Sequence, residues 1–167
     1  GKVIATAEQI QHGQELYQSR GLQQYGSVLG HGAYIGPDFT AEYLRLTTDA
    51  AVKQYREEGK QEPRELVKNE WRKENKYDES SKTLNWTAGQ TKGFDQMVNH
   101  YRDTLTKDNT SQGLFPNAIK SEEELHDLVA FFGWTAWASA AERPNQDYTY
   151  TNNWPAEANV DNKPTAD

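Results

Sequence analysis

Apolar residues recur at helical spacing along most of this chain, which predicts a mostly α-helical fold. In the first such stretch Ile10, Leu16 and Tyr17 share one face. Gly13 lies on the same face, although glycine costs about 1 kcal/mol relative to alanine inside a helix. Close approach by another helix would explain that glycine. The predicted helices cover residues 6–18, 40–58, 63–75 and 90–106, with a last helix that begins after residue 121.

Capping signals support the first and last of these helices. Thr6 with Gln9 and Ser121 with Glu124 each match the pattern of a capping box, in which the first side chain accepts from the helix backbone and the second reaches back. The last helix carries the strongest apolar stripe, which Trp134 and Trp137 are expected to widen. We expect this helix to cross the first one at Gly13.

Two other segments are not helical by pattern. In residues 80–88 polar and apolar residues alternate, which predicts a short strand or hairpin arm. After residue 142 the chain becomes rich in proline and asparagine and loses its periodicity. We therefore predict one domain over residues 1–142, mostly α with a small β hairpin. An extended C-terminal arm, residues 143–167, follows it as a linker.

Composition excludes several classes of function. The 167 residues carry a net charge of -7, which argues against nucleic-acid binding. The most basic stretch, residues 68–76, alternates lysine and arginine with glutamate and is interpreted as a solvated helix face. No cysteine is present, which excludes disulfides, thiolate metal sites and haem attached through Cys-x-x-Cys-His. The longest apolar run, residues 128–141, is too short to cross a bilayer.

Few residues offer chemistry of their own. No two of the four histidines lie four residues apart, and the single Glu-x-x-His, Glu123 to His126, is one copy of a motif that a di-iron bundle needs twice. We interpret these first-turn acids as favouring the helix dipole. The sequence contains neither a Gly-x-Ser-x-Gly nucleophile elbow nor a phosphate-binding loop. Nothing predicts a self-contained active site.

Residues 21–40, GLQQYGSVLGHGAYIGPDFT, form the most unusual segment. Five glycines and a proline exclude a regular helix and indicate a loop of specified shape, after which Asp38 or Thr40 can cap the next helix. His31 lies between two of the glycines. It could be an axial haem or metal ligand, but no second ligand is near it in the sequence, so we favour a loop histidine that hydrogen-bonds to backbone carbonyls.

Three strings in the chain resemble quinol-dependent nitric oxide reductases, which are single-chain membrane enzymes. They are SVLGHGAYIGPDFTAEYL at 27–44, YDESSKTLNWTAGQTKGFDQM at 77–97 and DYTYTNNWPAE at 147–157. The resemblance covers nearly the whole chain. It implies a cytochrome c-like extracytoplasmic domain between the first two transmembrane helices of the enzyme.

The resemblance also implies what the glycine-rich loop once held. In the small cytochrome c chain of the related two-chain reductases this loop reads Cys-x-x-Cys-His. Aligning the two places Leu22 and Tyr25 at the cysteines, Gly26 at the histidine ligand and Phe115 at the methionine ligand. All four haem-binding positions are thus replaced, and large side chains such as Tyr25 and Phe115 are expected to help fill the space. The residues expected to keep the shape of the loop are Gly30, His31, Gly32, Tyr34, Gly36, Pro37 and Asp38.

The expected function follows from this resemblance. The reductase converts two nitric oxide molecules to nitrous oxide and water, using haem b, haem b3 and a non-haem iron in a membrane domain that this chain lacks. The fragment is expected to bind no cofactor and to cap that membrane domain on the periplasmic side of the inner membrane. Tyr148, Tyr150 and Trp154 are expected to contact the membrane domain or lipid headgroups, with an ordinary surface tail as the alternative. The rival function is an electron carrier that holds haem noncovalently through His31.

Overall fold

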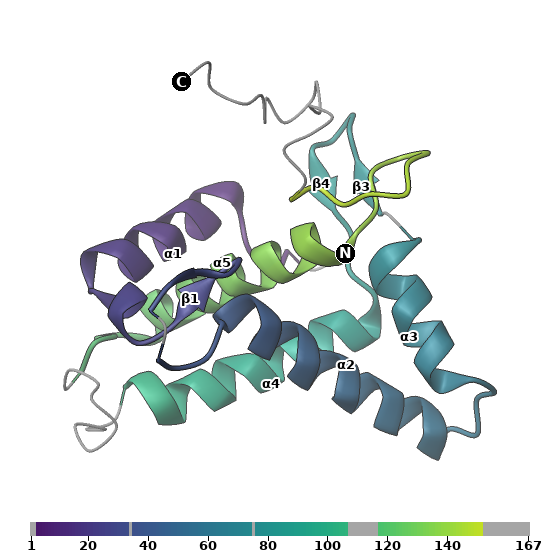
Figure 1. Cartoon of the computed structure of the whole chain (residues 1–167), viewed down its shortest axis with the longest axis horizontal. Coiled ribbons are helices and arrows are strands. Elements are labelled where there is room, and N and C mark those ends of the chain that lie inside the picture. Colours follow the sequence, from purple (N-terminus) through teal and green to yellow (C-terminus); the bar gives the residue numbers. More distant parts are fainter. Residues whose placement is uncertain (1–2, 34, 75, 107–116, 152–167) are drawn as a thin grey trace.

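The computed structural model describes residues 3–33, 35–74, 76–106 and 117–151. Within them five α helices surround one hydrophobic core, with a short 3-10 helix and two small hairpins at the edges (Figure 1). This arrangement confirms the predicted mostly α fold with a small β element. The helices are α1 (Ala7–Ser19), α2 (Phe39–Glu57), α3 (Pro63–Arg72), α4 (Ala88–Leu105) and α5 (Glu122–Ala140).

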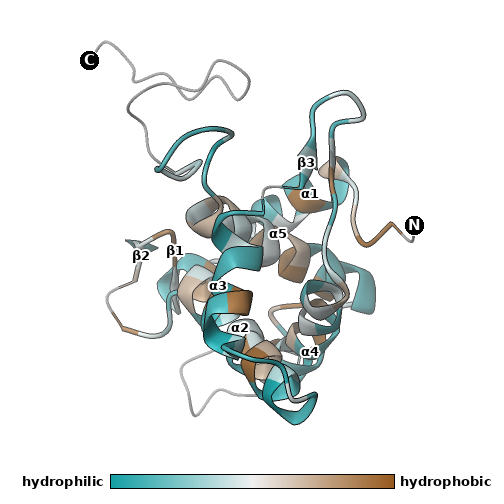
Figure 2. Cartoon of the chain, turned by 90° about the vertical axis from the view of Figure 1, so that its right-hand side faces the viewer, coloured by the Kyte–Doolittle hydropathy of each residue, from teal (hydrophilic) through white to brown (hydrophobic). Residues whose placement is uncertain are grey.

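Helix α5 is the centre of the molecule. It packs against α1, α2 and α4, while α3 lies against α2 (Figure 1). Leu125, Leu128, Val129 and Phe132 on α5 are fully buried. In the end-on view of Figure 2 the surrounding helices turn hydrophilic faces outward, as amphipathic helices around a core must.

Gly13 lies where α1 crosses α5, as predicted. A Cβ atom added there would lie 2.0 Å from the carbonyl oxygen of Asp127 and 2.9 Å from the Cβ of Phe131. Gly93 serves α4 in the same way, because a Cβ atom there would lie 2.9 Å from the Cγ2 of Thr47 on α2. Both glycines let helix backbones approach more closely than any larger residue would allow.

The capping predictions are confirmed in part. Thr6 and Gln9 form a reciprocal capping box at α1, and Asp38, rather than Thr40, caps α2. Ser121 caps α5, but the Glu124 carboxylate accepts from the backbone N–H of Lys120 instead of Ser121. A further capping box, Thr87 with Gln90, was not predicted and starts α4 at residue 88.

The described residues contain two hairpins, where the sequence predicted one. Strands β3 (Tyr77–Asp78) and β4 (Thr83–Leu84) pair antiparallel, so the hairpin arm predicted over residues 80–88 is a strand only at residues 83–84. Strands β1 (Ser27–Val28) and β2 (His31–Gly32) form the second hairpin inside the glycine-rich loop. A 3-10 turn, η1 (Leu22–Gln24), links α1 to β1.

Trp134 is the clearest error in the predicted core. Its side chain is 43% exposed, whereas Trp137 is buried as predicted. No helix among the described residues is long and apolar enough to span a bilayer.

Candidate functional site: the glycine-rich loop and its aromatic floor

The glycine-rich loop lies directly over the core. Leu22 at the start of η1 is completely buried, and Tyr25 is half-buried against the same core cluster. Gly26 lies beneath the ring of Phe39, the first residue of α2. A Cβ atom on Gly26 would come within 2.6 Å of that ring and 2.5 Å of the Pro37 carbonyl oxygen. Any side chain at position 26 is therefore excluded unless Phe39 and the loop move.

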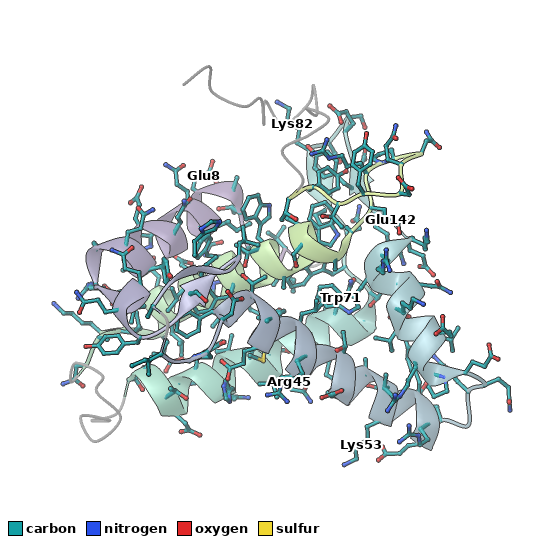
Figure 3. The ribbon with its side chains drawn as sticks, viewed as in Figure 1. Glu8, Arg45, Lys53, Trp71, Lys82 and Glu142 are labelled. Atoms are coloured by element: carbon teal, nitrogen blue, oxygen red, sulfur yellow. The ribbon has the colours of Figure 1, made fainter. Side chains whose placement is uncertain are left out.

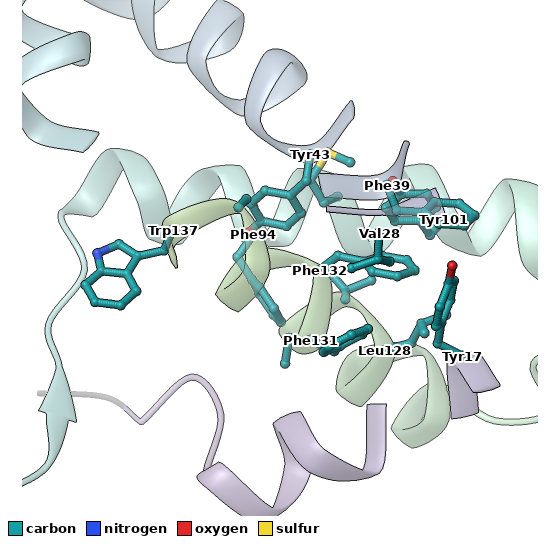
Figure 4. Packing of buried hydrophobic residues seen from close by; sticks show 14 of the residues in the cluster. Tyr17, Val28, Phe39, Tyr43, Phe94, Tyr101, Leu128, Phe131, Phe132 and Trp137 are labelled. Atoms are coloured by element: carbon teal, nitrogen blue, oxygen red, sulfur yellow. The ribbon is translucent and has the colours of Figure 1, made fainter. Parts of the chain in front are cut away.

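Aromatic rings fill the space beneath the loop. Phe39 and Phe132 stack with their ring centres 4.6 Å apart and their planes 6° from parallel (Figure 4). Tyr17 and Tyr101 meet the Phe39 ring edge-on at 6.1 and 5.8 Å. Such offset and edge-on arrangements favour aromatic pairs beyond the apolar area that they bury. Helices α1, α2, α4 and α5 each contribute a ring, so this cluster joins four elements.

Two tyrosine hydroxyls in this cluster have acceptors. Tyr17 donates to the Gly26 carbonyl at 3.0 Å, which ties the loop to α1, and Tyr101 donates to the Glu42 carboxylate at 2.7 Å. Burial is the main cause that raises the pKa of both phenols above the usual value. Both therefore stay protonated at neutral pH and act as hydrogen-bond donors.

Asp38 holds the ends of the loop together. One carboxylate oxygen caps α2 by accepting from the Ala41 N–H at 2.9 Å, and the other accepts from the Ser27 hydroxyl at 2.8 Å and the Gly30 N–H at 2.7 Å. Gly36 closes the loop where only glycine fits, since its φ is +107° and a Cβ atom would lie 1.9 Å from the Tyr25 carbonyl oxygen. The loop is thus fixed by its own residues.

His31 lies on the outer face of this loop. It is exposed in β2, and its ring makes no hydrogen bond or ion pair to any residue that the structure describes. The expected bond to backbone carbonyls is therefore not found there. His31 lines the edge of an open groove of about 1850 Å³ that extends to Trp86, Trp134 and Trp137. We call this groove the tryptophan groove.

The residues at the positions that the resemblance assigns to haem do not fit a covalently held haem. Leu22 and Tyr25 provide no thiol, Gly26 provides no ring nitrogen, and Phe39 occupies the space where a side chain at position 26 would project. Phe115 and Tyr34 lie outside the described residues. Over the described ranges no group of three or more histidine, aspartate or glutamate side chains could hold a metal ion.

A comparison with protein families decides what this helical domain is. Residues 1–156 match the model of the cytochrome c-like domain of the nitric oxide reductase protein NorB. The chain belongs to this family. No curated protein matches the sequence. Because the matched model describes one domain of NorB, this reductase domain is part of a larger membrane protein.

The described start of the C-terminal arm lies against the body of the reductase domain. Tyr150 packs over Trp137 at the end of α5, with ring centres 4.9 Å apart. The Arg143 guanidinium lies 5.2 Å from the centre of the Tyr148 ring, and the backbone N–H of Arg143 donates to the backbone carbonyl oxygen of Tyr148 at 3.0 Å. Trp154 lies outside the described residues, and the contacts expected of the three aromatic residues stay a prediction.

A buried carboxylate in the reductase domain was missed from the sequence. Asp127 on α5 is 3% exposed and accepts from the Gln9 side chain at 3.1 Å, while its other oxygen lies 2.8 Å from the His12 Nδ1. The His126 Nδ1 lies 3.3 Å from the first oxygen. The hydrogen bond between His12 and Asp127 is the main cause that raises the pKa of His12. The sequence signal that could have indicated this buried carboxylate was an aspartate inside a stripe of leucine, valine and phenylalanine.

Proposed function

We propose that this chain is the extracytoplasmic domain of a quinol-dependent nitric oxide reductase, that it binds no haem, and that it caps the catalytic membrane domain. The reduction of two nitric oxide molecules to nitrous oxide and water, with two electrons from quinol and two protons, would then take place in that membrane domain, whose haems and non-haem iron would supply the redox chemistry. The strings at 27–44 and 147–157 support the quinol-dependent class. Membership of the NorB family supports the assignment of the chain to a nitric oxide reductase.

One observation carries the haem-free role. The ring of Phe39 closes the ligand position at Gly26 and stacks on Phe132, so a packed aromatic cluster occupies the floor of the loop. Protein interiors resist voids, and a vacated haem space left empty would be costly. The cluster removes that cost and joins four helices. A domain whose four helices are joined by one packed aromatic cluster suits a structural role.

A haem titration of the purified chain, followed by visible absorption, tests this role. We expect no saturable one-to-one Soret band for the unchanged chain. The variants His31→Ala and His100→Ala form a matched pair, because both histidines have solvent-accessible rings but only His31 lies in the glycine-rich loop. A saturable band that His31→Ala abolishes and His100→Ala retains would overturn the proposal. It would instead support an electron carrier with His31 as a haem ligand.

A further inference from the structure

A basic groove lies between α2 and α3, although the chain as a whole is acidic. It has a volume of about 710 Å³ and contains five cationic side chains and one acidic one, Asp49. The cations come from both helices. Residues 68–76, which look like an alternating, solvated face in the sequence, contribute two of these cations, Lys68 and Arg72, together with Trp71. The cations of the basic groove are Lys53, Arg56, Arg64, Lys68 and Arg72.

Three of these cations are available for a ligand. Lys68 is paired with Glu65 at 3.3 Å, and Arg72 with Glu142 at 3.1 Å. Among the described residues Lys53, Arg56 and Arg64 have no acidic partner, and all three are exposed. In a chain with net charge -7, unpaired cations gathered around one hollow favour an anion there.

The floor of the basic groove is apolar. Val67 and Trp71 on α3 are 2% and 5% exposed, and Val52 on α2 is partly buried beside them. Figure 3 shows Lys53 on α2 and Trp71 on α3, the two helices that form its walls. Cations above an apolar floor suit a ligand with a negatively charged head and an apolar body. Lysine and arginine side chains at a membrane surface bind lipid headgroups in a similar setting, with their charges in water beside an apolar layer.

The basic groove adjoins the tryptophan groove. Leu44 and Ser139 line both, Thr149 lines the first, and Tyr150 lines the second. The exposed cations of the basic groove and the exposed side chain of Trp134 therefore lie along two adjoining grooves. Aromatic belts and basic residues are the features that proteins present to the bilayer interface.

We propose that the basic groove binds the phosphate headgroup of an anionic phospholipid. This inference rests on the proposed function, which places the domain at a membrane surface. Lys53, Arg56 and Arg64 would contact the phosphate, while Val67 and Trp71 would contact the glycerol and the first methylene groups. The lipid would thereby fix which face of the domain is turned toward the bilayer.

The test measures sedimentation of the purified chain with vesicles of phosphatidylcholine, with and without phosphatidylglycerol. We expect binding only with phosphatidylglycerol, and we expect salt to weaken it. The variant Lys53→Gln/Arg64→Gln should bind about 30-fold less tightly, at about 1 kcal/mol for each cation lost. The control Arg102→Gln/Lys120→Gln removes the same charge outside the groove and should bind like the unchanged chain.

Several outcomes would overturn the lipid site. Equal weakening in both double variants would mean that net charge alone drives binding. Absence of binding to phosphatidylglycerol vesicles would remove the site. Displacement by inorganic phosphate at low concentration would indicate a free anion instead, and stronger binding to poly-glutamate than to vesicles would indicate an acidic peptide. The haem titration does not depend on any of these results, so the proposed function stands or falls separately.

Discussion

At the scale of single residues, the crossing of α1 and α5 depends on what lies at Gly13 and Asp127. The glycine lets the two backbones meet, and the buried carboxylate beside it takes hydrogen bonds from Gln9 and His12. A buried charge is tolerated only when it is well paired. Two predictions concern this crossing.

The variant Gly13→Ala should be less stable than the unchanged chain. The added methyl group would press on the Asp127 carbonyl and on Phe131, at a cost of about 1–3 kcal/mol. The control Gly89→Ala places a methyl group in ordinary contact at 3.7 Å on α4 and should gain up to about 1 kcal/mol from helix propensity. Urea unfolding measures both, and equal stability of the two variants would contradict the close crossing.

His12 should make stability depend on pH. Its pKa is raised in the folded chain, mainly by the hydrogen bond to Asp127, so the added stability is fully present below 6.5 and is lost as pH rises through the raised pKa. The side chain is 45% exposed, so we expect less than about 1 kcal/mol. Glu15 and Glu124 act in the same direction.

The measurement compares urea unfolding of the unchanged chain and of His12→Gln from below pH 6.5 to a pH above the raised pKa of His12. We expect the stability of the unchanged chain to fall with rising pH by more than that of His12→Gln. His100→Gln serves as the control and should retain the dependence that His12 provides. An identical pH dependence in all three proteins would show that the pair of His12 with Asp127 contributes nothing.

At the scale of elements, Asp38 makes the glycine-rich loop and α2 one unit. Its two carboxylate oxygens serve the helix cap and the loop at the same time. Phe39, the next residue, then places its ring against Gly26. The shape of the loop and the packing of the aromatic cluster therefore depend on the same two residues.

The variant Asp38→Ala should lose about 2 kcal/mol, the upper end for a helix cap, because the loop loses its acceptor as well. Hydrogen exchange should accelerate at the N–H groups of Gly30 and Ala41. The control Thr87→Ala removes the cap of α4 alone and should cost about 1 kcal/mol without changing exchange at Gly30. Unchanged exchange at Gly30 in Asp38→Ala would show that the loop does not depend on this carboxylate.

At the scale of the whole molecule, local signals in the sequence predicted the helices and the crossing, because caps and periodicity act over a few residues. Thr6 and Ser121 were predicted as helix caps, and Gly13 was predicted at the helix crossing. The basic groove and the position of Asp127 could not be predicted in this way, since they depend on which helices become neighbours. The prediction for Trp134 was wrong for the same reason. Helical spacing placed this residue on the apolar stripe of the last helix, but its side chain is 43% exposed in the packed domain.

The stack of Phe39 on Phe132 has a consequence for anyone who wishes to engineer a haem ligand into this scaffold. Gly26→His alone would clash with the Phe39 ring, and Phe39→Ala alone would leave a void at a cost of about 3–5 kcal/mol. Such a loss is a large part of the stability of an ordinary domain, which is about 5–15 kcal/mol. A stepwise mutational path therefore passes through a single variant of low stability. Only a combined change with haem supplied from the start avoids that intermediate.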